Sequence, residues 1–425
     1  MAIETPPGYR ALDESSLPAY LAGLPPIVSR LGGRAEEWTV NEVGDGNLNL
    51  VFIVEGPSGA ICVKQALPYV RLVGESWPLP LDRAFFEYRA SVIQAGHVGA
   101  LVPEILHYDA GLYLIVMERL SPHIIMRQGT IRAVIYPQFA GHITDYLARS
   151  LFFTSDLAMK AGDKKAMVAT FCANTELCRI TEDLIFTDPY RIAELNRWTS
   201  PGLDAEAAAI RGDEGLKRAV SVLKMKFMTE TQALLHGDLH TGSIMITQQD
   251  TRVIDPEFAF FGPMGFDVGK LIGNLLLAYF SQRGHEHQPG ERDAYRQWLL
   301  ETAETVWNGF AQKFTALWNA HGTGDAFPAS LFEGEAGRLS LGKAQHGFMR
   351  QLFEDALGYA GCSMIRRTLG LAHNIDMEQI EDHGRRAACE RRNLTLARDL
   401  IRNAASIASI EAVTARAALI EAGGS

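Results

Sequence analysis

The segment His236-Gly237-Asp238-Leu239-His240-Thr241-Gly242-Ser243 is the most informative part of this 425-residue chain. It follows a helical pattern, so we predict a loop that presents the Asp238 carboxylate. Such a carboxylate can accept the proton of a substrate hydroxyl group or fix the direction of that group. The tripeptide His-Gly-Asp is only suggestive by itself, because short motifs also match by chance.

A second acidic motif, Asp255-Pro256-Glu257, follows the loop after two short predicted strands, residues 243–246 and 251–255. Carboxylates at positions i and i+2 can both reach Mg²⁺, a hard cation that prefers oxygen ligands. The alternative is a polar turn around Pro256 without a metal. The order of the two motifs favours phosphoryl transfer, which needs a cation on the phosphates and a carboxylate on the attacking hydroxyl group.

The two histidines of the loop, His236 and His240, are also of a type that binds zinc. No third ligand lies at metal-binding spacing, however. We therefore expect these side chains to hydrogen-bond the backbone and hold the loop in shape. Asp267, in a predicted helix, is expected to accept backbone N–H bonds from the same loop.

Upstream, residues 38–64 have the alternation of a three-strand meander. The turn Gly44 to Asn49 joins the first two strands, and its glycines would let backbone N–H groups approach phosphate. Lys64 ends the third strand, where its ammonium group could reach the phosphates of ATP, and Glu87 on a predicted helix over residues 81–95 is placed to pair with it. Taken singly, these features are also compatible with a hairpin turn, a solvated lysine and a surface glutamate.

After a strand at residues 113–117, the apolar spacing changes to that of helices. These are expected over residues 137–153, 216–234, 266–280, 295–317, 348–371 and 393–422. The predicted fold class is α+β with two lobes. A small β-rich N-terminal lobe covers residues 1–120, and a larger, mainly α-helical C-terminal lobe covers residues 121–425.

Composition excludes several classes of partner. The formal net charge is −10 at pH 7 and no dense run of lysine and arginine occurs, which argues against nucleic acid. The most apolar segment, residues 271–280, is shorter than the roughly 20 residues of a membrane helix, so we expect no membrane association. Five scattered cysteines and an N-terminus without signal-peptide features indicate a soluble cytoplasmic protein with reduced thiols.

In this order, the glycine turn, the strand lysine and the two acidic motifs resemble the kinase-like phosphotransferases of the aminoglycoside and choline kinase type. These enzymes have a two-lobed, protein-kinase-like fold. The resemblance is closer to the methylthioribose kinase family and extends from Tyr9 to about His373. The segments that carry it are Gly44 to Asn49, Gly74 to Leu79, His236 to Ile244, Ile254 to Phe260 and Ala360 to His373.

The resemblance implies ATP-dependent phosphorylation of 5-methylthioribose at its anomeric 1-hydroxyl group, a step in methionine salvage, by a cytoplasmic homodimer. The implied ATP-site residues are Asn47, Asn49, Lys64, Glu87, the hinge Glu118-Arg119-Leu120 and Asp255-Pro256-Glu257. The implied substrate contacts are Asp238, Arg366, Arg367 and Trp77, whose indole could cover the methylthio group. The candidate Mg²⁺ ligands are Asp255, Glu257 and Ser243, which stands where the wider superfamily usually has asparagine.

Alternatives stay open at this point. Another small-molecule kinase, for homoserine, choline, fructosamine or an aminoglycoside, would share most of these motifs, although an arginine pair suits polyols and anions better than cationic substrates. A nucleotide-binding pseudokinase is disfavoured by the complete set of Lys64, Asp238, Asp255 and Glu257. Without the resemblance, Trp77 would be interpreted as a core residue and the arginines as surface salt bridges. Residues 393–422 could pack on the large lobe or on a partner subunit.

Overall fold

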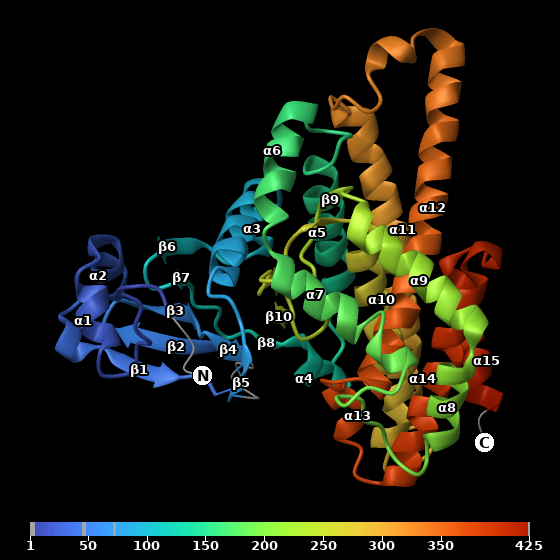
Figure 1. The fold of residues 1–425 in the computed structure, drawn as a ribbon, viewed down its shortest axis with the longest axis horizontal. Coiled ribbons are helices and arrows are strands. Elements are labelled where there is room, and N and C mark those ends of the chain that lie inside the picture. The colour runs from blue at the N-terminus through green and yellow to red at the C-terminus, as the bar shows by residue number, and fades with distance from the viewer. Residues whose placement is uncertain (1–4, 45–47, 71–73, 424–425) are drawn as a thin grey trace.

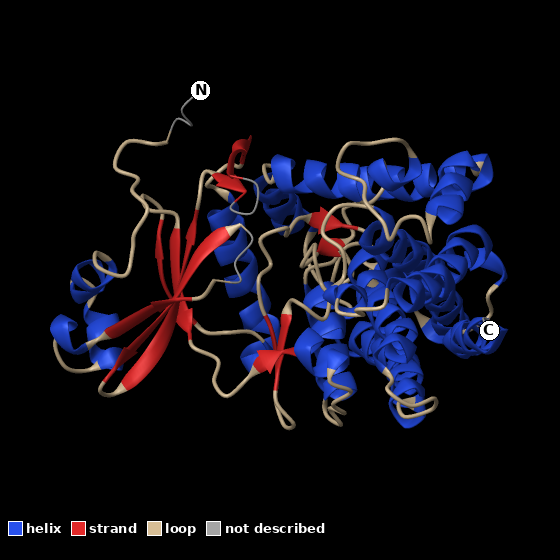
Figure 2. Ribbon diagram, turned by 90° about the horizontal axis from the view of Figure 1, so that it is seen from below, coloured by secondary structure: helices blue, strands red, loops and turns tan. Residues whose placement is uncertain are grey.

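The computed structural model describes residues 5–44, 48–70 and 74–423, which form two lobes (Figure 1). The N-terminal lobe contains β1 (Thr39–Glu42), β2 (Asn49–Gly56), β3 (Gly59–Ala66), β4 (Tyr69–Val70), β5 (Gly74–Pro78), β6 (Ile105–Asp109) and β7 (Leu114–Glu118), with α1 (Leu17–Ala22), α2 (Pro25–Leu31) and α3 (Arg83–Val98). Figure 2 shows this strand-rich part at one end of the molecule and most helices at the other.

The C-terminal lobe is mainly helical. Its short strands are β8 (Ile124–Ile125), β9 (Ala233–Leu234), β10 (Ile244–Ile246), β11 (Thr251–Val253) and β12 (Phe261–Gly262). Its helices are α4 (Met126–Ile131), α5 (Phe139–Phe153), α6 (Ala161–Phe171), α7 (Thr175–Leu184), α8 (Asp204–Gly212), α9 (Glu214–Thr229), α10 (Gly265–Ser281), α11 (Asp293–His321), α12 (Gly334–Leu369), α13 (Ile375–Glu378), α14 (His383–Asn403) and α15 (Ile410–Gly423). The predicted α+β class with two unequal lobes is confirmed, whereas the boundary at residue 120 stays a prediction.

The main sheet of the N-terminal lobe is antiparallel, in the order β1-β2-β3-β7-β6. Alternate residues of its central strands face the core, and Phe52, Val54, Ile61 and Val63 are almost completely buried. Aromatic and β-branched residues at alternate positions fit such a half-buried surface, and the predicted meander is confirmed. Strand β6 has no clear alternation, because all of its residues are partly buried, and the pattern does not predict it. Most of the predicted glycine turn, residues 45–47, lies outside the described residues.

Helix α10 is the centre of the C-terminal lobe. All of its residues are buried, and it packs against α11, α12 and α14. Gly269 and Gly273 allow a close approach to α12, because a Cβ at either position would press on the backbone of that helix. The approach matters for function, since α10 and α12 both carry charged side chains that reach the site described below. Within the described residues, no helix combines the length and the apolar character that crossing a bilayer requires.

The prediction of one continuous helix over residues 393–422 is wrong. Helix α14 ends at Asn403 and α15 begins at Ile410, with buried Ile407 between them. The apolar spacing continues across this break, so periodicity does not reveal it. Helix α14 packs on α12 and α15 packs on α11, so both segments pack on the large lobe of their own chain.

Candidate active site

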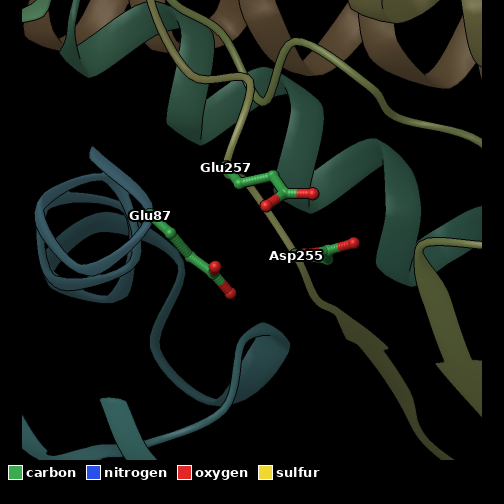
Figure 3. A group of neighbouring side chains, drawn as sticks. All are labelled: Glu87, Asp255 and Glu257. Atoms are coloured by element: carbon green, nitrogen blue, oxygen red, sulfur yellow. The ribbon is translucent and has the colours of Figure 1, made fainter. Parts of the chain in front are cut away.

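Three carboxylate side chains from the two lobes meet at one place. Glu87 lies on α3, and Asp255 and Glu257 lie on the segment after β11 (Figure 3). One oxygen atom of each lies within 4.8 Å of the others. The φ angle of Asp255 is +70°, a left-handed value that is uncommon outside glycine and that is often found at functional sites. Oxygen ligands in such an arrangement fit a hard divalent cation such as Mg²⁺.

Lys64 on β3 is the cation at the centre of these acids. Its Nζ atom lies 2.9 Å from Oε1 of Glu87, as predicted, and also contacts Oδ1 of Asp255. Burial alone would lower the pKa of Lys64, but the surrounding carboxylates outweigh burial and raise it. Burial raises the pKa of Glu87 to about 8, although Lys64 acts in the opposite direction. Asp255 and Glu257 also raise this pKa, so the three carboxylates repel one another and a bound divalent cation would favour their ionised forms.

Glu257 is held from the N-terminal lobe by a buried arginine and an asparagine. The Nδ2 atom of Asn49 donates to Oε2 of Glu257 at 2.9 Å, and its Oδ1 atom accepts from Nη2 of Arg83 at 2.9 Å. Arg83 is 1% exposed, and its Nε atom lies 3.6 Å from Glu257. The hydrogen bond from Arg83 orients Asn49, which in turn holds Glu257, and the Arg83 guanidinium adds an ion pair to Glu257. The structure thus brings Asn49 together with the acidic motif.

Asp267 on α10 fixes the backbone of the loop that carries Asp238. Its two carboxylate oxygens accept the N–H groups of His236 at 2.6 Å and Gly237 at 3.1 Å, as predicted. Gly237 has a φ of +81°, and a Cβ atom there would collide with the carbonyl oxygen of Phe258. Only glycine fits this turn without strain, which explains the middle residue of the motif.

Both histidines hold the loop, in agreement with the sequence prediction. In His236, Nδ1 accepts the N–H of Asp238 at 3.2 Å and Nε2 lies 2.8 Å from the carbonyl oxygen of Ile254. In His240, Nδ1 accepts the N–H of Gly242 at 2.8 Å, which places the hydrogen on Nε2, 3.2 Å from Oδ2 of Asp238. Burial lowers the pKa of His240 well below its usual value, so the ring is neutral. Both nitrogens of each ring are therefore engaged, which disfavours zinc binding.

The Asp238 carboxylate has a partner on each oxygen. Lys270 on α10 contacts Oδ1, and His240 faces Oδ2. Burial alone would raise the pKa of Asp238, but Lys270, His240 and Arg367 outweigh burial and hold the pKa well below its usual value. The carboxylate is consequently ionised at neutral pH, which is the form that accepts a hydrogen bond from a hydroxyl group.

Further cations lie close to Asp238. Arg366 and Arg367 come from the last turn of α12, and Arg127 comes from α4. Burial, followed by the charges of Arg366 and Arg127, lowers the pKa of Arg367 well below its usual value. The Nε and Nη1 atoms of Arg366 are buried and have no hydrogen-bond partner among the described residues. Buried donors without acceptors are costly, so this arrangement fits an anionic or hydroxyl-rich ligand.

Ser243 has a different environment from the acidic group. Its hydroxyl group donates to the carbonyl oxygen of Asp238 at 3.0 Å and accepts the N–H of His240 at 2.9 Å. It therefore stabilises the loop that carries Asp238 from within. A role for Ser243 as a metal ligand stays a prediction.

The remaining predicted residues lie around this centre. Glu118 ends β7 and accepts a hydrogen bond from Arg252 at 3.3 Å, while Arg119 pairs with Glu55. Trp77 on β5 packs in a small apolar cluster with Leu48, Leu79, Leu177, Ile180 and Phe258. Leu120, the residue after Arg119, is half-buried. Pro256 is buried within the acidic motif. Asn47 lies outside the described residues.

Three charged residues of the site are not predicted from the sequence. Lys270 follows Asp267 by one turn in a mostly apolar helix. A lysine in such a helix indicates a buried ion pair, because buried lysines are nearly always paired with an acid. Arg83 precedes Glu87 by four residues and shares its helix face, which is a weaker signal. Arg127 gives no local signal. Its partners, Asp376 at 3.5 Å and His240 at 3.1 Å, are distant in the sequence.

Comparison with known proteins identifies the family of this chain. The model of the phosphotransferase enzyme family matches residues 39–310. Methylthioribose kinase 1 of Oryza sativa subsp. japonica is 49% identical over 406 residues, which cover 95% of this chain and 94% of that protein. Methylthioribose kinase of Escherichia coli O45:K1 is 48% identical over 414 residues, with coverage of 97% and 98%. A solved glucosamine kinase, in complex with glucosamine, ADP and inorganic phosphate, covers 91% of this chain and 86% of its own at 13% identity, with a TM-score of 0.47. The chain therefore belongs to the methylthioribose kinases, within the phosphotransferase enzyme family of ATP-dependent small-molecule kinases.

Proposed function

We propose that this protein transfers the γ-phosphoryl group of ATP to the anomeric 1-hydroxyl group of 5-methylthioribose, giving 5-methylthioribose 1-phosphate and ADP in methionine salvage. The observation that carries the proposal is the ionised Asp238 carboxylate, held among buried cations and supported by a rigid loop. The 49% identity to a methylthioribose kinase supports the choice of sugar.

The ATP half of the reaction is assigned to the acidic group and its neighbours. Lys64, oriented by Glu87 at 2.7 Å, would neutralise the α and β phosphates. Asp255 and Glu257 would hold Mg²⁺, which when bound supplies the remaining neutralisation of the phosphate charge. Asn49 and the backbone of the hinge, residues 118–120, would complete the nucleotide site.

Asp238 would act on the acceptor. Its carboxylate orients the 1-hydroxyl group and takes up its proton as the sugar oxygen bonds to the γ-phosphorus and the bond to the leaving oxygen of ADP breaks. Because the transition state of this transfer is loose, orientation counts for more than the basicity of the carboxylate. A low pKa at Asp238 is therefore compatible with the role.

Substrate recognition is assigned to the arginine pair and to Trp77. The unpartnered Nε and Nη1 atoms of Arg366 would donate to sugar hydroxyl groups or to the transferred phosphoryl group, and Arg367 would add positive charge. Trp77 would cover the apolar methylthio end, with the buried side chains of Leu79 and Leu177 packed in the same apolar cluster. The excess of cations near Asp238 disfavours a cationic acceptor such as choline or an aminoglycoside.

We also propose that the protein acts as a cytoplasmic homodimer. All five cysteine thiols are free, which supports a reducing compartment. Light scattering on the purified protein is expected to give twice the mass of one chain, and a single-chain mass across the micromolar range would contradict the dimer.

The substrate assignment is tested by ADP release with a panel of acceptors. Purified protein with MgATP is expected to release ADP with 5-methylthioribose at a kcat/KM at least about 100-fold above that with choline, homoserine, a fructosamine or an aminoglycoside. Faster release with any of these acceptors would overturn the choice of sugar. Absence of release with every acceptor would favour a pseudokinase.

A further inference from the structure

Lys270 is a buried lysine whose role is not explained by the proposed function. Lys270 lies on α10 and is 2% exposed. Its Nζ atom contacts Oδ1 of Asp238. The same ammonium group lies 5.3 Å from the ring centroid of Phe266. Asp238 is the ion-pair partner of Lys270 among the described residues.

The surroundings of Lys270 oppose its charge. Burial lowers the pKa of Lys270 to about 8, and the guanidinium groups of Arg367 and Arg366 act in the same direction, whereas Asp238 opposes them. The Asp238 carboxylate is the one group that favours the charged form of Lys270 among the causes of this shift, and the contact between them pairs the two charges.

Helix α10 holds the catalytic loop at two levels. Asp267 accepts the N–H groups of His236 and Gly237 and so fixes the backbone. Lys270, one turn further along the same helix, holds the side chain of Asp238 itself. Since α10 is buried throughout and packs tightly on α12, both contacts are anchored on a helix that is fixed by packing on all sides.

We propose that Lys270 is a positioning residue that fixes the orientation of the Asp238 carboxylate through Oδ1, so that the other lone pairs of the carboxylate meet the acceptor hydroxyl group. This inference rests on the proposed function, in which Asp238 orients the acceptor. Lys270 acts through Asp238, so its loss should reduce kcat and leave the ATP site unchanged.

The chain contains a matched control. Lys164 is also 2% exposed, pairs with an aspartate, Asp156, and lies 5.6 Å from an aromatic ring centroid, that of Phe261. It has no contact with Asp238 or with the acidic group among the contacts of the described residues. Lys164→Met therefore removes a buried, paired lysine without touching the site.

The kinetic test compares Lys270→Met, Lys270→Arg and Lys164→Met in full-length protein with MgATP and 5-methylthioribose. We expect Lys270→Met to lower kcat at least about 30-fold with the ATP KM changed by less than about threefold, and Lys270→Arg to recover part of the loss. Lys164→Met should retain kcat within about threefold. Equal losses of kcat in the Lys270→Met and Lys164→Met variants, or a kcat near wild type in Lys270→Met, would overturn the inference.

A crystal structure tests the role of Lys270 independently of activity. If the wild-type protein phosphorylates none of the acceptors, that result counts against the proposed function and not against the position of the Asp238 side chain. In a crystal structure of Lys270→Met, the Asp238 side chain should leave its orientation while Asp267 keeps its bonds to the loop backbone. An Asp238 carboxylate that stays in place without the lysine would overturn the positioning role.

Discussion

The two charged groups of the site have opposite balances. At the acidic motif, the carboxylates of Glu87, Asp255 and Glu257 share Lys64, with Arg83 behind them. At the loop that carries Asp238, the carboxylates of Asp238 and Asp376 lie among four cationic side chains, which are Lys270, Arg127, Arg366 and Arg367. In the first group acidic side chains outnumber basic ones, and in the second group basic side chains outnumber acidic ones.

The difference teaches what each group lacks. Buried like charges repel strongly in a low-dielectric interior, and a ligand of opposite charge relieves the repulsion. The acidic group is therefore suited to a cation, and the basic group to an anion or to negative charge that develops during a reaction. A phosphoryl transfer supplies both, since Mg²⁺ accompanies ATP and the transferred group carries its charge toward the acceptor.

The largest expected effect comes from removing the Asp238 carboxylate from the basic group. Asp238→Asn keeps the size of the side chain but loses the carboxylate that orients and deprotonates the acceptor, so kcat should fall at least about 100-fold while the ATP KM changes little. Initial rates of ADP release measure both constants. Asp355→Asn, which affects a buried aspartate 2.7 Å from Lys226, is the control. Unchanged turnover in Asp238→Asn would remove this residue from the reaction.

The next effect comes from removing the one cation that the three acids share. Lys64→Ala should raise the ATP KM about 10-fold or more, because the phosphates lose their lysine and the acids lose their internal counter-charge. Lys226→Ala provides the comparison, since Lys226 is paired with Asp355 outside the site. Normal ATP KM and kcat values in Lys64→Ala would contradict the assignment.

A third effect concerns the metal. Asp255 is the most accessible of the three acids, with 45% of its side chain exposed, so Asp255→Asn should change the site with little change in folding. We expect the Mg²⁺ concentration for half-maximal rate to rise about 10-fold. Asp156→Asn also affects an exposed aspartate paired with a buried lysine, and it should leave this Mg²⁺ concentration unchanged. The same Mg²⁺ dependence in both variants would show that Asp255 is not a ligand.

The smallest expected effect is on stability and concerns a buried carboxyl group that lies outside both charged groups. Glu390 on α14 is 1% exposed, and burial raises its pKa to about 7 although Thr199 and Arg386 oppose the rise. The folded protein holds this proton more tightly than the unfolded chain, so the stabilisation is present at low pH and is lost as the pH rises through about 7.

Glu390→Gln mimics the protonated form at every pH. We expect its Tm to match wild type at about pH 5 and to exceed it by about 2–4 °C at about pH 8, measured by thermal unfolding. The exposed Glu335→Gln variant should show no such pH-dependent gain. A Tm difference that is the same at both pH values would indicate that Glu390 is already charged at pH 5 in the folded protein.

Much of this site could be predicted from the sequence, because its key residues belong to short local motifs. The Lys64–Glu87 pair, the support from Asp267 and the structural roles of both histidines were accessible in this way. The basic group was less accessible, because the packing of α4 and α10, rather than proximity in sequence, brings Arg127 to His240 and Lys270 to Asp238. The break between α14 and α15 was missed for a related reason, since apolar periodicity records which residues are buried and not whether the backbone is continuous.

Phosphorus NMR of the reaction mixture tests the central claim most directly, because it identifies the phosphorylated product as well as the loss of ATP. With MgATP, 5-methylthioribose and wild-type protein, we expect a new sugar phosphomonoester signal at the anomeric position in equal amount to ADP, and at most about one hundredth of that signal in the same time with Asp238→Asn. Formation of ADP with inorganic phosphate and no sugar phosphate, or an equal phosphomonoester signal from the Asp238→Asn variant, would contradict the account.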